Sequence, residues 1–485
     1  MKRRLLFYVT ILFISICIYN LKFNSKIEAS SIIDYYTYEE NSDGTIAITA
    51  FDKTQVLNVD FEIPSEINGK AVTKIGNNVF EQCNSLHTNL VIPSSVTSIG
   101  DYAFAHCSGF EGNLVIPNSV TSIGKYAFCE CSSFQGNLVI GNNVKIIGEG
   151  AFYGCTGLTG DLTIPDSVTE VGSQAFLYCF SFNGNLTLSK NMDKISSYTF
   201  KDCNELTGDL VIPDNIKNIE AGAFYGCYGF NGILSIGNNV TNIDDKAFNG
   251  CNKLIGDLNI PSSVTNIGDY AFARCNELNG NLNLENSVIK IGKYAFLGDS
   301  KLKGELAIPN TVTDIGFQAF LDCSGFDGNL TIGNNVETIE EGAFFNCSGL
   351  TGDLIIPKSV TSIGQNAFYQ CSELNRIKFL GNAPTISEKT FNTYAKKIYY
   401  RRDTIGYTEE NGWPIEQLVE YGTGDINGDG KVNVNDLNYG LRGLSRNTLS
   451  ESEKEMGDVN GDNLFNVNDL NKLLRYLVGK IRNLA

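Results

Sequence analysis

The sequence contains little of several residue types on which enzymes and nucleic-acid-binding proteins rely. Only two of the 485 residues are histidine, His87 and His106, so chemistry that needs a histidine base or ligand has little to draw on. Basic residues are also scarce, with 37 Lys and Arg against 54 Asp and Glu, a formal net charge of −17. A chain this acidic is not a nucleic-acid binder by its bulk charge.

Long apolar runs are missing beyond the N-terminus. Lys2, Arg3 and Arg4 precede an almost unbroken apolar run over residues 5–21, and Ala29-Ser30 offers a cleavage point. This pattern predicts a signal peptide over residues 1–29 and a secreted, extracellular protein. Because the run is slightly long, an uncleaved membrane anchor is the alternative. No later segment is apolar for long enough to span a membrane.

The regularity that is present is a repeat of 24 residues. Thirteen phenylalanines keep this spacing from Phe80 to Phe368. Such a period is typical of a solenoid, in which each coil buries its apolar face only against its neighbours. In the coil over residues 113–136, we expect a short strand ending at Pro117. A second apolar stretch at Val120 and Ile123 follows, and then a short helical turn at Ala127-Phe128.

Cysteine follows the same period. Cysteines in a secreted chain usually indicate disulfides, but one cysteine per coil places parallel side chains about 4.8 Å apart, which suits packing better than bridging. We therefore expect small buried side chains with free thiols. Asp299 fills the one vacant position, and Cys129, off the period, is expected to be partly exposed. The periodic set is Cys83, Cys107, Cys131, Cys155, Cys179, Cys203, Cys227, Cys251, Cys275, Cys323, Cys347 and Cys371.

This repeat resembles the BspA-like leucine-rich repeat family. The family's pattern, L-x-I-P-x-S-V-T-x-I-G-x-x-A-F-x-x-C, is met over residues 90–107, 114–131, 162–179 and 354–371. The resemblance covers about residues 60 to 420 and implies an α/β fold, a right-handed solenoid of 24-residue coils with a parallel sheet along one face. It does not imply one activity.

A longer period of 48 residues, the 48-residue rhythm, is superimposed on the 24-residue repeat. It is visible in the prolines after the first strand, Pro165, Pro213, Pro261, Pro309 and Pro357. Duplication of two-coil blocks is one explanation, and a surface that alternates to match a repeating ligand is the other.

The ends of the repeat differ from its middle, as caps of a solenoid do. An Asp43-Gly44 turn between strand-like runs predicts an N-terminal hairpin that covers the first coil. At the other end, Trp413 is expected in the core of a C-terminal cap. The expected boundaries are a signal peptide 1–29, an N-terminal cap and first coil 30–82, repeats 83–375, a C-terminal cap 376–420 and a calcium-binding domain 424–485.

Two twelve-residue calcium loops follow the repeats. Oxygen ligands at loop positions 1, 3, 5 and 12, with a backbone carbonyl at position 7, suit calcium because it is a hard ion that takes six to eight oxygens. In the second loop Asn463 replaces the glycine of the turn (Gly430 in the first), which asparagine tolerates. We expect two structural calcium ions, whose ligands are Asp425, Asn427, Asp429, Lys431 (carbonyl) and Asp436, then Asp458, Asn460, Asp462, Leu464 (carbonyl) and Asp469.

Each loop leads into one helix with an apolar face. Val434, Leu437, Leu441 and Leu444 share helical spacing, and Val467, Leu470, Leu474 and Leu477 repeat it 33 residues later. Two loop–helix units over residues 424–484, with Asp at position 12, resemble the type I dockerin; a generic bacterial EF-hand pair is the alternative. The resemblance implies binding to a cohesin module of a scaffold protein. The implied contact residues are Val434, Asn435, Leu441 and Arg442, and Val467, Asn468, Leu474 and Arg475. Because the two sets are identical, docking in two orientations is expected; packing within the tail is the alternative role for the valines and leucines.

The repeats do not suggest an active site. Catalysis needs a unique constellation of groups, whereas repeats supply the same residues many times. Asp161 and Asp209, two coils apart, would lie about 9.6 Å apart, a separation compatible with inverting glycosidases, but nothing distinguishes one acid from the other. Tyr102, Tyr126, Tyr198, Tyr270 and Tyr294 share one position in the coil and could stack on sugars or pack half-buried.

We therefore expect a non-catalytic component of a cellulosome-like complex for polysaccharide breakdown, monomeric before assembly. Its repeats would bind a protein or a carbohydrate. The alternatives are a polysaccharide-degrading enzyme, suggested only because many dockerin-bearing chains are enzymes, and an adhesin or inhibitor acting on other proteins.

Overall fold

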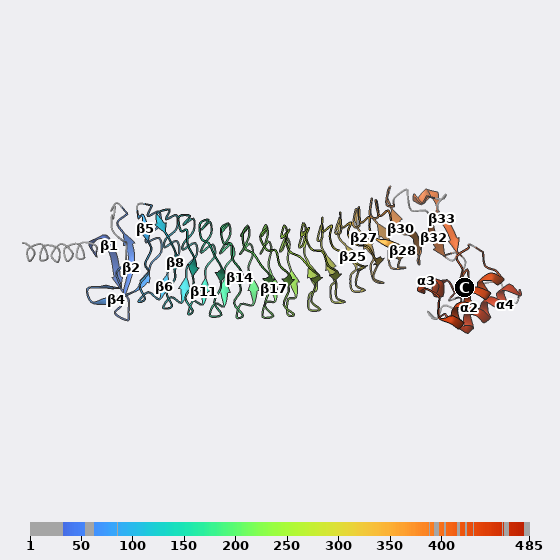
Figure 1. Cartoon of the computed structure of the whole chain (residues 1–485), viewed down its shortest axis with the longest axis horizontal. Helices are drawn as coiled ribbons and strands as arrows, with labels where there is room; N and C mark the ends of the chain where they lie inside the picture. The colour runs from blue at the N-terminus through green and yellow to red at the C-terminus, as the bar shows by residue number, and fades with distance from the viewer. Residues whose placement is uncertain are drawn as a thin grey trace, which may run out of the picture. The chain divides into compact units, whose positions relative to one another are not determined.

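The computed structural model describes residues 33–53, 63–84, 86–387, 389–391, 397–401, 404–414, 418–421, 424–429, 431–457, 459 and 465–479. The expected signal peptide, residues 1–29, lies outside them. The chain divides into two compact units, residues 1–231 and 232–485. Each unit contains parallel β-solenoid coils of about 24 residues, and the helices belong to the C-terminal module of the second unit (Figure 1). Within the described residues, no helix has the length and apolar character that a membrane span requires.

The first unit begins with an antiparallel hairpin, as the Asp43-Gly44 turn predicts. Strands β1 and β2 pair across it, and β4 continues the sheet in parallel on the other side of β2. In the hairpin core, the Tyr36 ring packs on Phe51 and on Phe80 of the first coil. The bounds are η1 (Ile33–Tyr35), β1 (Tyr36–Glu40), β2 (Ile46–Phe51), β3 (Glu66–Ile67) and β4 (Lys70–Ile75).

The long parallel sheets are formed by the second apolar stretch of each coil. Its isoleucine or valine points inward and its preceding residue outward, as at Ser122–Ile123. These strands form the parallel sheet that the resemblance implies, while the first strands pair separately. The strands are β6 (Ser98–Ile99), β9 (Ser122–Ile123), β11 (Ile146–Ile147), β13 (Glu170–Val171), β15 (Lys194–Ile195) and β17 (Asn218–Ile219), and in the second unit β19 (Asn242–Ile243), β21 (Asn266–Ile267), β23 (Lys290–Ile291), β25 (Asp314–Ile315), β27 (Thr338–Ile339), β29 (Ser362–Ile363) and β31 (Thr385–Ile386).

The first strands mostly pair in twos, so the 48-residue rhythm has a structural counterpart. Strands β8 and β10, β12 and β14, and β20 and β22 each form a separate parallel pair. The backbone conformation before these strands also alternates from coil to coil. The glycine before every second strand has a positive φ, as at Gly160 (+80°) and Gly256 (+86°). Residues other than glycine adopt this conformation only with strain. In the first unit the strands are β5 (Thr88–Asn89), β7 (Phe110–Glu111), β8 (Leu114–Val115), β10 (Leu138–Val139), β12 (Leu162–Thr163), β14 (Leu186–Thr187) and β16 (Leu210–Val211).

The second unit contains further first strands of the coils and has longer strands near its C-terminal end. Trp413 is buried there, with its ring 5.0 Å from that of Phe379 and 4.8 Å from that of Tyr407. The bounds are β18 (Leu234–Ser235), β20 (Leu258–Asn259), β22 (Leu282–Asn283), β24 (Leu306–Ala307), β26 (Asn329–Thr331), β28 (Thr351–Ile356), β30 (Leu374–Phe379), β32 (Ile398–Arg401), η2 (Glu409–Asn411), β33 (Leu418–Tyr421), α2 (Val434–Arg446), α3 (Glu451–Gly457) and α4 (Val467–Leu477).

Between the strands, each coil contains hydrogen-bonded turns where a short helical turn was expected. Tyr126 and Glu130 have φ values of +51° and +56°, which no right-handed helix contains. Alternate N–H groups, such as that of Phe128, donate instead to the following coil, here to the carbonyl of Ala151 at 2.7 Å. These bonds stack the coils where no strand is present.

The core consists of ladders, that is, rows of equivalent side chains stacked from one coil to the next. Within each unit, phenylalanines of successive coils stack with nearly parallel rings, as Phe104 and Phe128 do at 5.0 Å and 4°. All thirteen cysteines in the described residues are free and buried. Cys129 is also buried, with 6% of its surface exposed, so the expectation that it is partly exposed was wrong. Its side chain fills a position that Tyr153 or Ala105 fills in neighbouring coils.

Candidate functional site

The first calcium loop is organised around two buried carboxylates. Asp425 and Asp436 are both almost completely inaccessible to solvent. They accept hydrogen bonds from one short turn: Asp429 N–H donates to Asp425 Oδ1 at 3.1 Å, and Asn427 N–H donates to Asp436 Oδ1 at 3.2 Å. Two carboxylates buried beside the same turn are costly unless a cation or several donors compensate them.

The ligand types of this loop fit calcium. No group of three or more His, Cys, Asp or Glu side chains within the described residues converges tightly enough to hold a metal ion. The first loop offers mixed oxygen groups: the Asp425 and Asp436 carboxylates, the exposed Asp429, the Asn427 amide and the Lys431 carbonyl. Such oxygen-only, flexible sets suit calcium and not transition metals. In the second loop Asp458, Asn460, Asp462 and Leu464 lie outside the described residues, whereas Asp469 is described and buried.

Both helices begin with the same capping box. Asn433 Oδ1 accepts from Asn435 N–H at 2.8 Å, while Asp436 Oδ2 accepts from Asn433 N–H at 2.8 Å. Asn466 and Asp469 repeat this arrangement at the start of α4 with the same 2.8 Å distance. The last loop aspartate thus also caps the helix, which joins the loop to the helix rigidly. Sequence reasoning missed this role, although Asn followed three residues later by Asp was visible in both copies.

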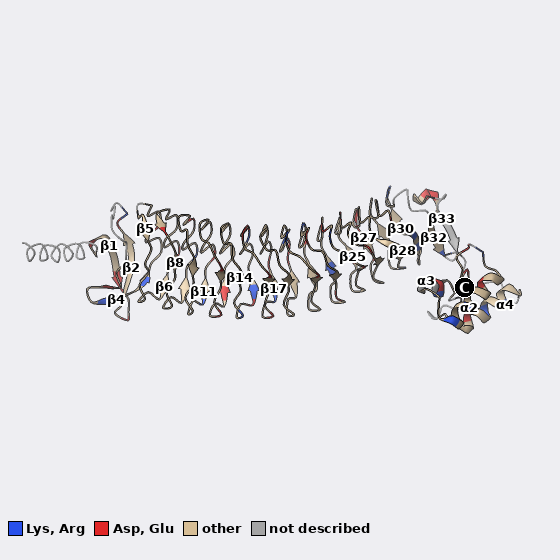
Figure 2. Ribbon diagram, viewed as in Figure 1, with Lys and Arg blue, Asp and Glu red and all other residues tan. Residues whose placement is uncertain are grey.

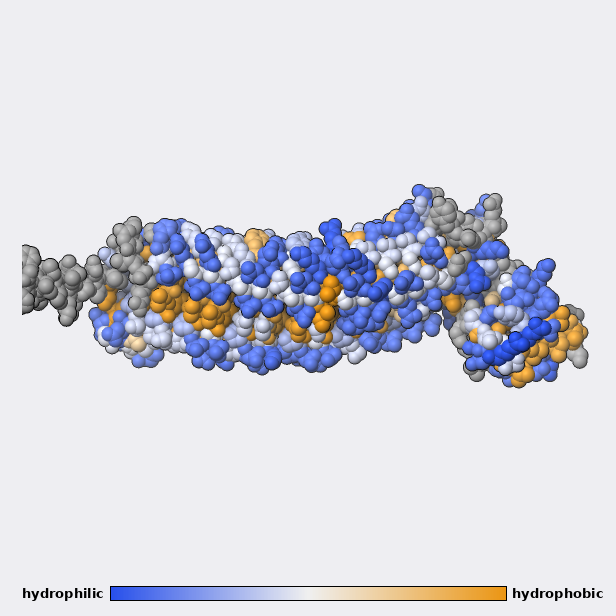
Figure 3. Space-filling model, in the orientation of Figure 1, coloured by the Kyte–Doolittle hydropathy of each residue, from blue (hydrophilic) through white to orange (hydrophobic). Residues whose placement is uncertain are grey.

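The apolar residues that were expected to share one helix face lie in two different environments, the core of the module and its solvent-exposed surface. Leu437 and Leu444 pack against a small core of Ile426, Val459, Leu470 and Leu473, in which Leu473 was not anticipated. Val434 and Leu441 instead face solvent. Their exposed fractions, 59% and 47%, match those of the equivalent Val467 and Leu474, 60% and 44%. Figure 3 shows apolar surface on the module that contains α2 and α4. Asn435, Arg442, Asn468 and Arg475 are also exposed.

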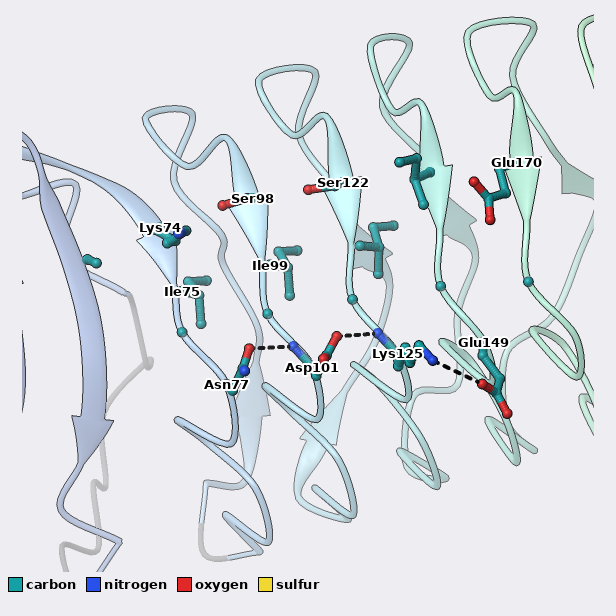
Figure 4. A pocket seen from close by; sticks show the side chains of 18 of the residues that line it. Lys74, Ile75, Asn77, Ser98, Ile99, Asp101, Ser122, Lys125, Glu149 and Glu170 are labelled. Atoms are coloured by element: carbon teal, nitrogen blue, oxygen red, sulfur yellow. Dashed lines mark hydrogen bonds and ion pairs between the residues drawn. The ribbon is translucent and has the colours of Figure 1, made fainter. Parts of the chain in front are cut away.

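The first unit carries a groove along its long sheet. Its cavity has a volume of about 860 Å³ and crosses the outward-facing residues of several coils, among them Ser98, Ser122 and Glu170. Figure 4 shows Asp101 and Lys125 joined to the neighbouring coils, with Lys125 Nζ 3.4 Å from the Glu149 carboxylate. Acidic and basic residues both occur along the coils (Figure 2). The groove itself has charged side chains of both signs beside apolar ones, among them the exposed Ile146.

Several acidic side chains of the repeats accept hydrogen bonds from backbone N–H groups of the next coil. Asp161 Oδ1 accepts from Asn185 N–H of the next coil at 2.7 Å, and Asp257 does the same for Asn281. Asp101 Oδ1 accepts from Lys125 N–H at 2.8 Å. The pair of Asp161 and Asp209 is not distinguished from these structural acids. Tyrosines at the shared coil position stack on one another, as Tyr270 and Tyr294 do at 4.5 Å with left-handed backbones.

These features define a parallel β-solenoid joined to a helical module with duplicated oxygen-rich loops. Family models match both parts. The BspA type leucine-rich repeat region matches residues 44–183, 135–255, 194–327 and 301–406, and the dockerin type I domain matches residues 423–478. The chain belongs to the BspA-type leucine-rich repeat family, and it carries a C-terminal type I dockerin domain.

The chain is similar to solved structures, and the first of the two described here supports the fold. A leucine-rich repeat protein from Bacteroides ovatus is 24% identical over 80% of this chain and 98% of its own length, with a TM-score of 0.56. A leucine-rich cell surface protein from Faecalibacterium prausnitzii is 26% identical over 73% of this chain and 94% of its own, with a TM-score of 0.42. No curated protein matches the chain. Solenoids and dockerins of these kinds are typically non-catalytic, and no catalytic domain is found.

Proposed function

We propose that this protein is a secreted, non-catalytic component of a cellulosome-like complex. Its dockerin would bind a cohesin module of a scaffold protein, and its repeats would bind a protein or a carbohydrate. The observation that carries the proposal is the duplicated set of exposed residues beside the calcium loops, in which Val434 and Leu441 match Val467 and Leu474 in type, position and exposure. In each helix the exposed valine and leucine lie seven residues apart, on one face, and contiguous exposed apolar surface is typical of a binding site.

Calcium has a structural role in this proposal. Two ions would neutralise the buried aspartates of the loops, represented here by Asp436 and Asp469, and so fix the starts of α2 and α4. The free energy of ion binding then stabilises the folded module. Because Val434 and Val467 directly follow the capping residues Asn433 and Asn466, the positions of the exposed apolar residues depend on the loops.

The identity of the two exposed sets supports docking in either of two orientations. Each set contains Val, Asn, Leu and Arg in the same order and spacing. A rotation that exchanges α2 with α4 would present a cohesin with the same groups. The repeats would remain available to their own ligand in both orientations.

Two measurements on the full chain test the proposal. Size-exclusion chromatography in calcium should show co-elution of the protein with a type I cohesin at one-to-one stoichiometry. A reducing-sugar assay on xylan, cellulose and mannan should show no release above a buffer control. If the protein co-elutes with no member of a panel of cohesins, the proposed attachment is contradicted. Sugar release by the purified chain would contradict the non-catalytic role.

A further inference from the structure

A second cleft lies on the first unit, away from the groove along the long sheet. Its volume is about 510 Å³, within the range of ligand sites. Three aromatic side chains form one part of its lining: Tyr153, Tyr178 and Phe180. Small polar and charged side chains form the rest: Asn84, His106, Ser108, Glu130, Ser132 and Thr156. The lining thus has an aromatic side and a hydrogen-bonding side.

The aromatic side breaks the repeat. Phe180 occupies the coil position that is Asn84, Ser108, Ser132 and Thr156 in the four preceding coils and Asn204 in the next. It is 39% exposed, and every other coil of the first unit except that of Tyr228 has a polar residue at this position. Tyr178 likewise stands where the neighbouring coils have Glu130, Gly154 and Asp202. The cleft is therefore a local constellation, of the kind that a repeating surface does not supply.

The rings are inclined to one another. Tyr178 and Phe180 lie 5.6 Å apart at 46°, and Tyr153 and Tyr178 lie 5.7 Å apart at 76°. Coplanar rings would form a platform for a flat, extended surface, whereas inclined rings form a curved wall around a small group. Lys201 Nζ, 4.7 Å from the centre of the Tyr178 ring, supports that ring by a cation–π contact.

The polar side chains of the lining are held by hydrogen bonds to one another. His106 Nδ1 lies 3.0 Å from Glu130 Oε2, so these two groups form a pair across adjacent coils. Ser108 is also held, because both its N–H and its hydroxyl donate to Asn84 Oδ1. The lining residues include no Lys or Arg for an anionic ligand, and their one carboxylate, Glu130, is already hydrogen-bonded to His106. A neutral ligand with one apolar face and a hydroxyl-rich edge would match both sides of the lining.

We propose that this cleft binds a neutral carbohydrate, one or two pyranose units of a soluble chain. The C–H face of a pyranose would pack on Tyr178 and Phe180, and its hydroxyls would meet the His106–Glu130 pair and Ser132. This proposal rests on the proposed function, because it names the ligand class of the repeat region. It predicts binding of soluble oligosaccharides and not of crystalline cellulose, since the wall is curved.

The test is isothermal titration calorimetry of the full chain with cellotetraose, xylotetraose and mannotetraose. At least one should bind, and Phe180→Ser should weaken that binding roughly tenfold through loss of a stacked ring. The substitution places in this coil the residue that Ser108 and Ser132 provide in others, so the solenoid should fold normally. The matched control is Tyr228→Ser, two coils further on at the same position, 42% exposed and not part of the lining, which should bind like the unaltered protein.

Three outcomes would overturn the inference: no binding of any neutral oligosaccharide, equal binding by Phe180→Ser, or binding of a peptide that Phe180→Ser abolishes while sugars have no effect. Cohesin co-elution of the same preparations separates this inference from the proposed function. If the protein binds cohesin but no sugar, only the proposed cleft is contradicted. If it does not bind cohesin, the proposed attachment is contradicted, and calorimetry with sugars still decides on the cleft.

Discussion

The Cys131 thiol donates a hydrogen bond to the carbonyl oxygen of Phe104, 27 residues earlier, at 3.0 Å. The same bond, from 2.8 to 3.3 Å, joins each of nine other cysteines to the phenylalanine of the preceding coil. The phenylalanine and cysteine periods are therefore linked, since each thiol compensates a buried carbonyl beside the stacked rings.

The thiol bond should contribute measurably to stability. We expect Cys131→Ala to lower the free energy of unfolding by about 1–2 kcal/mol, because it leaves a buried carbonyl without a donor. Cys131→Ser, whose hydroxyl can donate to the same carbonyl, should lose less. Urea unfolding of the three proteins measures the difference, and an alanine variant as stable as the serine variant would contradict the role of the bond.

The thiols should also be chemically inert. Burial raises the pKa of Cys371 to about 12 and, together with the neighbouring Glu130, that of Cys129 to about 12. At pH 8 the reactive thiolate is therefore almost absent. Ellman's reagent should find no fast-reacting thiol in the native protein at pH 8 and should react with the ladder cysteines in guanidinium chloride. Rapid labelling of several native thiols would contradict the structure.

Asp299, the residue in the vacant cysteine position, should make stability depend on pH. It is buried, Cys275 N–H donates to its Oδ1 at 2.8 Å, and its Oδ2 has no hydrogen-bond partner within the described residues. Burial raises the pKa of Asp299 well above its ordinary value. The folded state therefore holds the proton more tightly than the unfolded state, so stability falls as pH rises above about 4.

The variant Asp299→Asn isolates this effect, because the amide keeps the shape and the acceptor but cannot ionise. The stability advantage of the variant should grow by up to about 1.4 kcal/mol per pH unit between pH 4 and the raised pKa. Thermal unfolding of both proteins from pH 4 to 8 measures it. Parallel stability curves for the two proteins would show that Asp299 does not titrate as proposed.

The two exposed sets of the dockerin should substitute for each other. Val434→Asp with Leu441→Asp should leave cohesin affinity within a few-fold, and so should Val467→Asp with Leu474→Asp, because the second set remains. All four changes together should abolish binding. Titration calorimetry with a cohesin gives the affinities, and circular dichroism of each variant controls for folding, since all four residues are exposed. Loss of binding with either pair alone would indicate a single orientation.

Much of the solenoid could be predicted because its period is exact in the sequence. The spacing of Phe80 to Phe368 predicted the coils, and the burial of Cys131 and its equivalents followed from one side chain per coil. The turns could not be predicted, since the left-handed conformations of Tyr126 and Glu130 are imposed by bonds to the next coil and not by residue type. The thiol–carbonyl bonds were missed for the same reason.

The tail was less completely predictable. The calcium ligands taken from the loop spacing stay a prediction. Helical spacing could not tell that Leu437 turns to the core while Val434 and Leu441 face solvent, since all lie within a broad apolar stripe. The cleft at Phe180 was not predicted either. Its signal was a break in the repeat, visible as an aromatic residue where the four preceding coils and the next one have serine, threonine or asparagine.

The central claim is that a calcium-folded tail attaches the protein while the solenoid folds independently of the metal. The most direct measurement is cohesin titration and circular dichroism of the full chain, in calcium and after chelation with EGTA. The account predicts that chelation abolishes cohesin binding and removes the helical signal of α2 and α4, while the thermal transition of the solenoid is unchanged. Cohesin binding that persists in EGTA would contradict it.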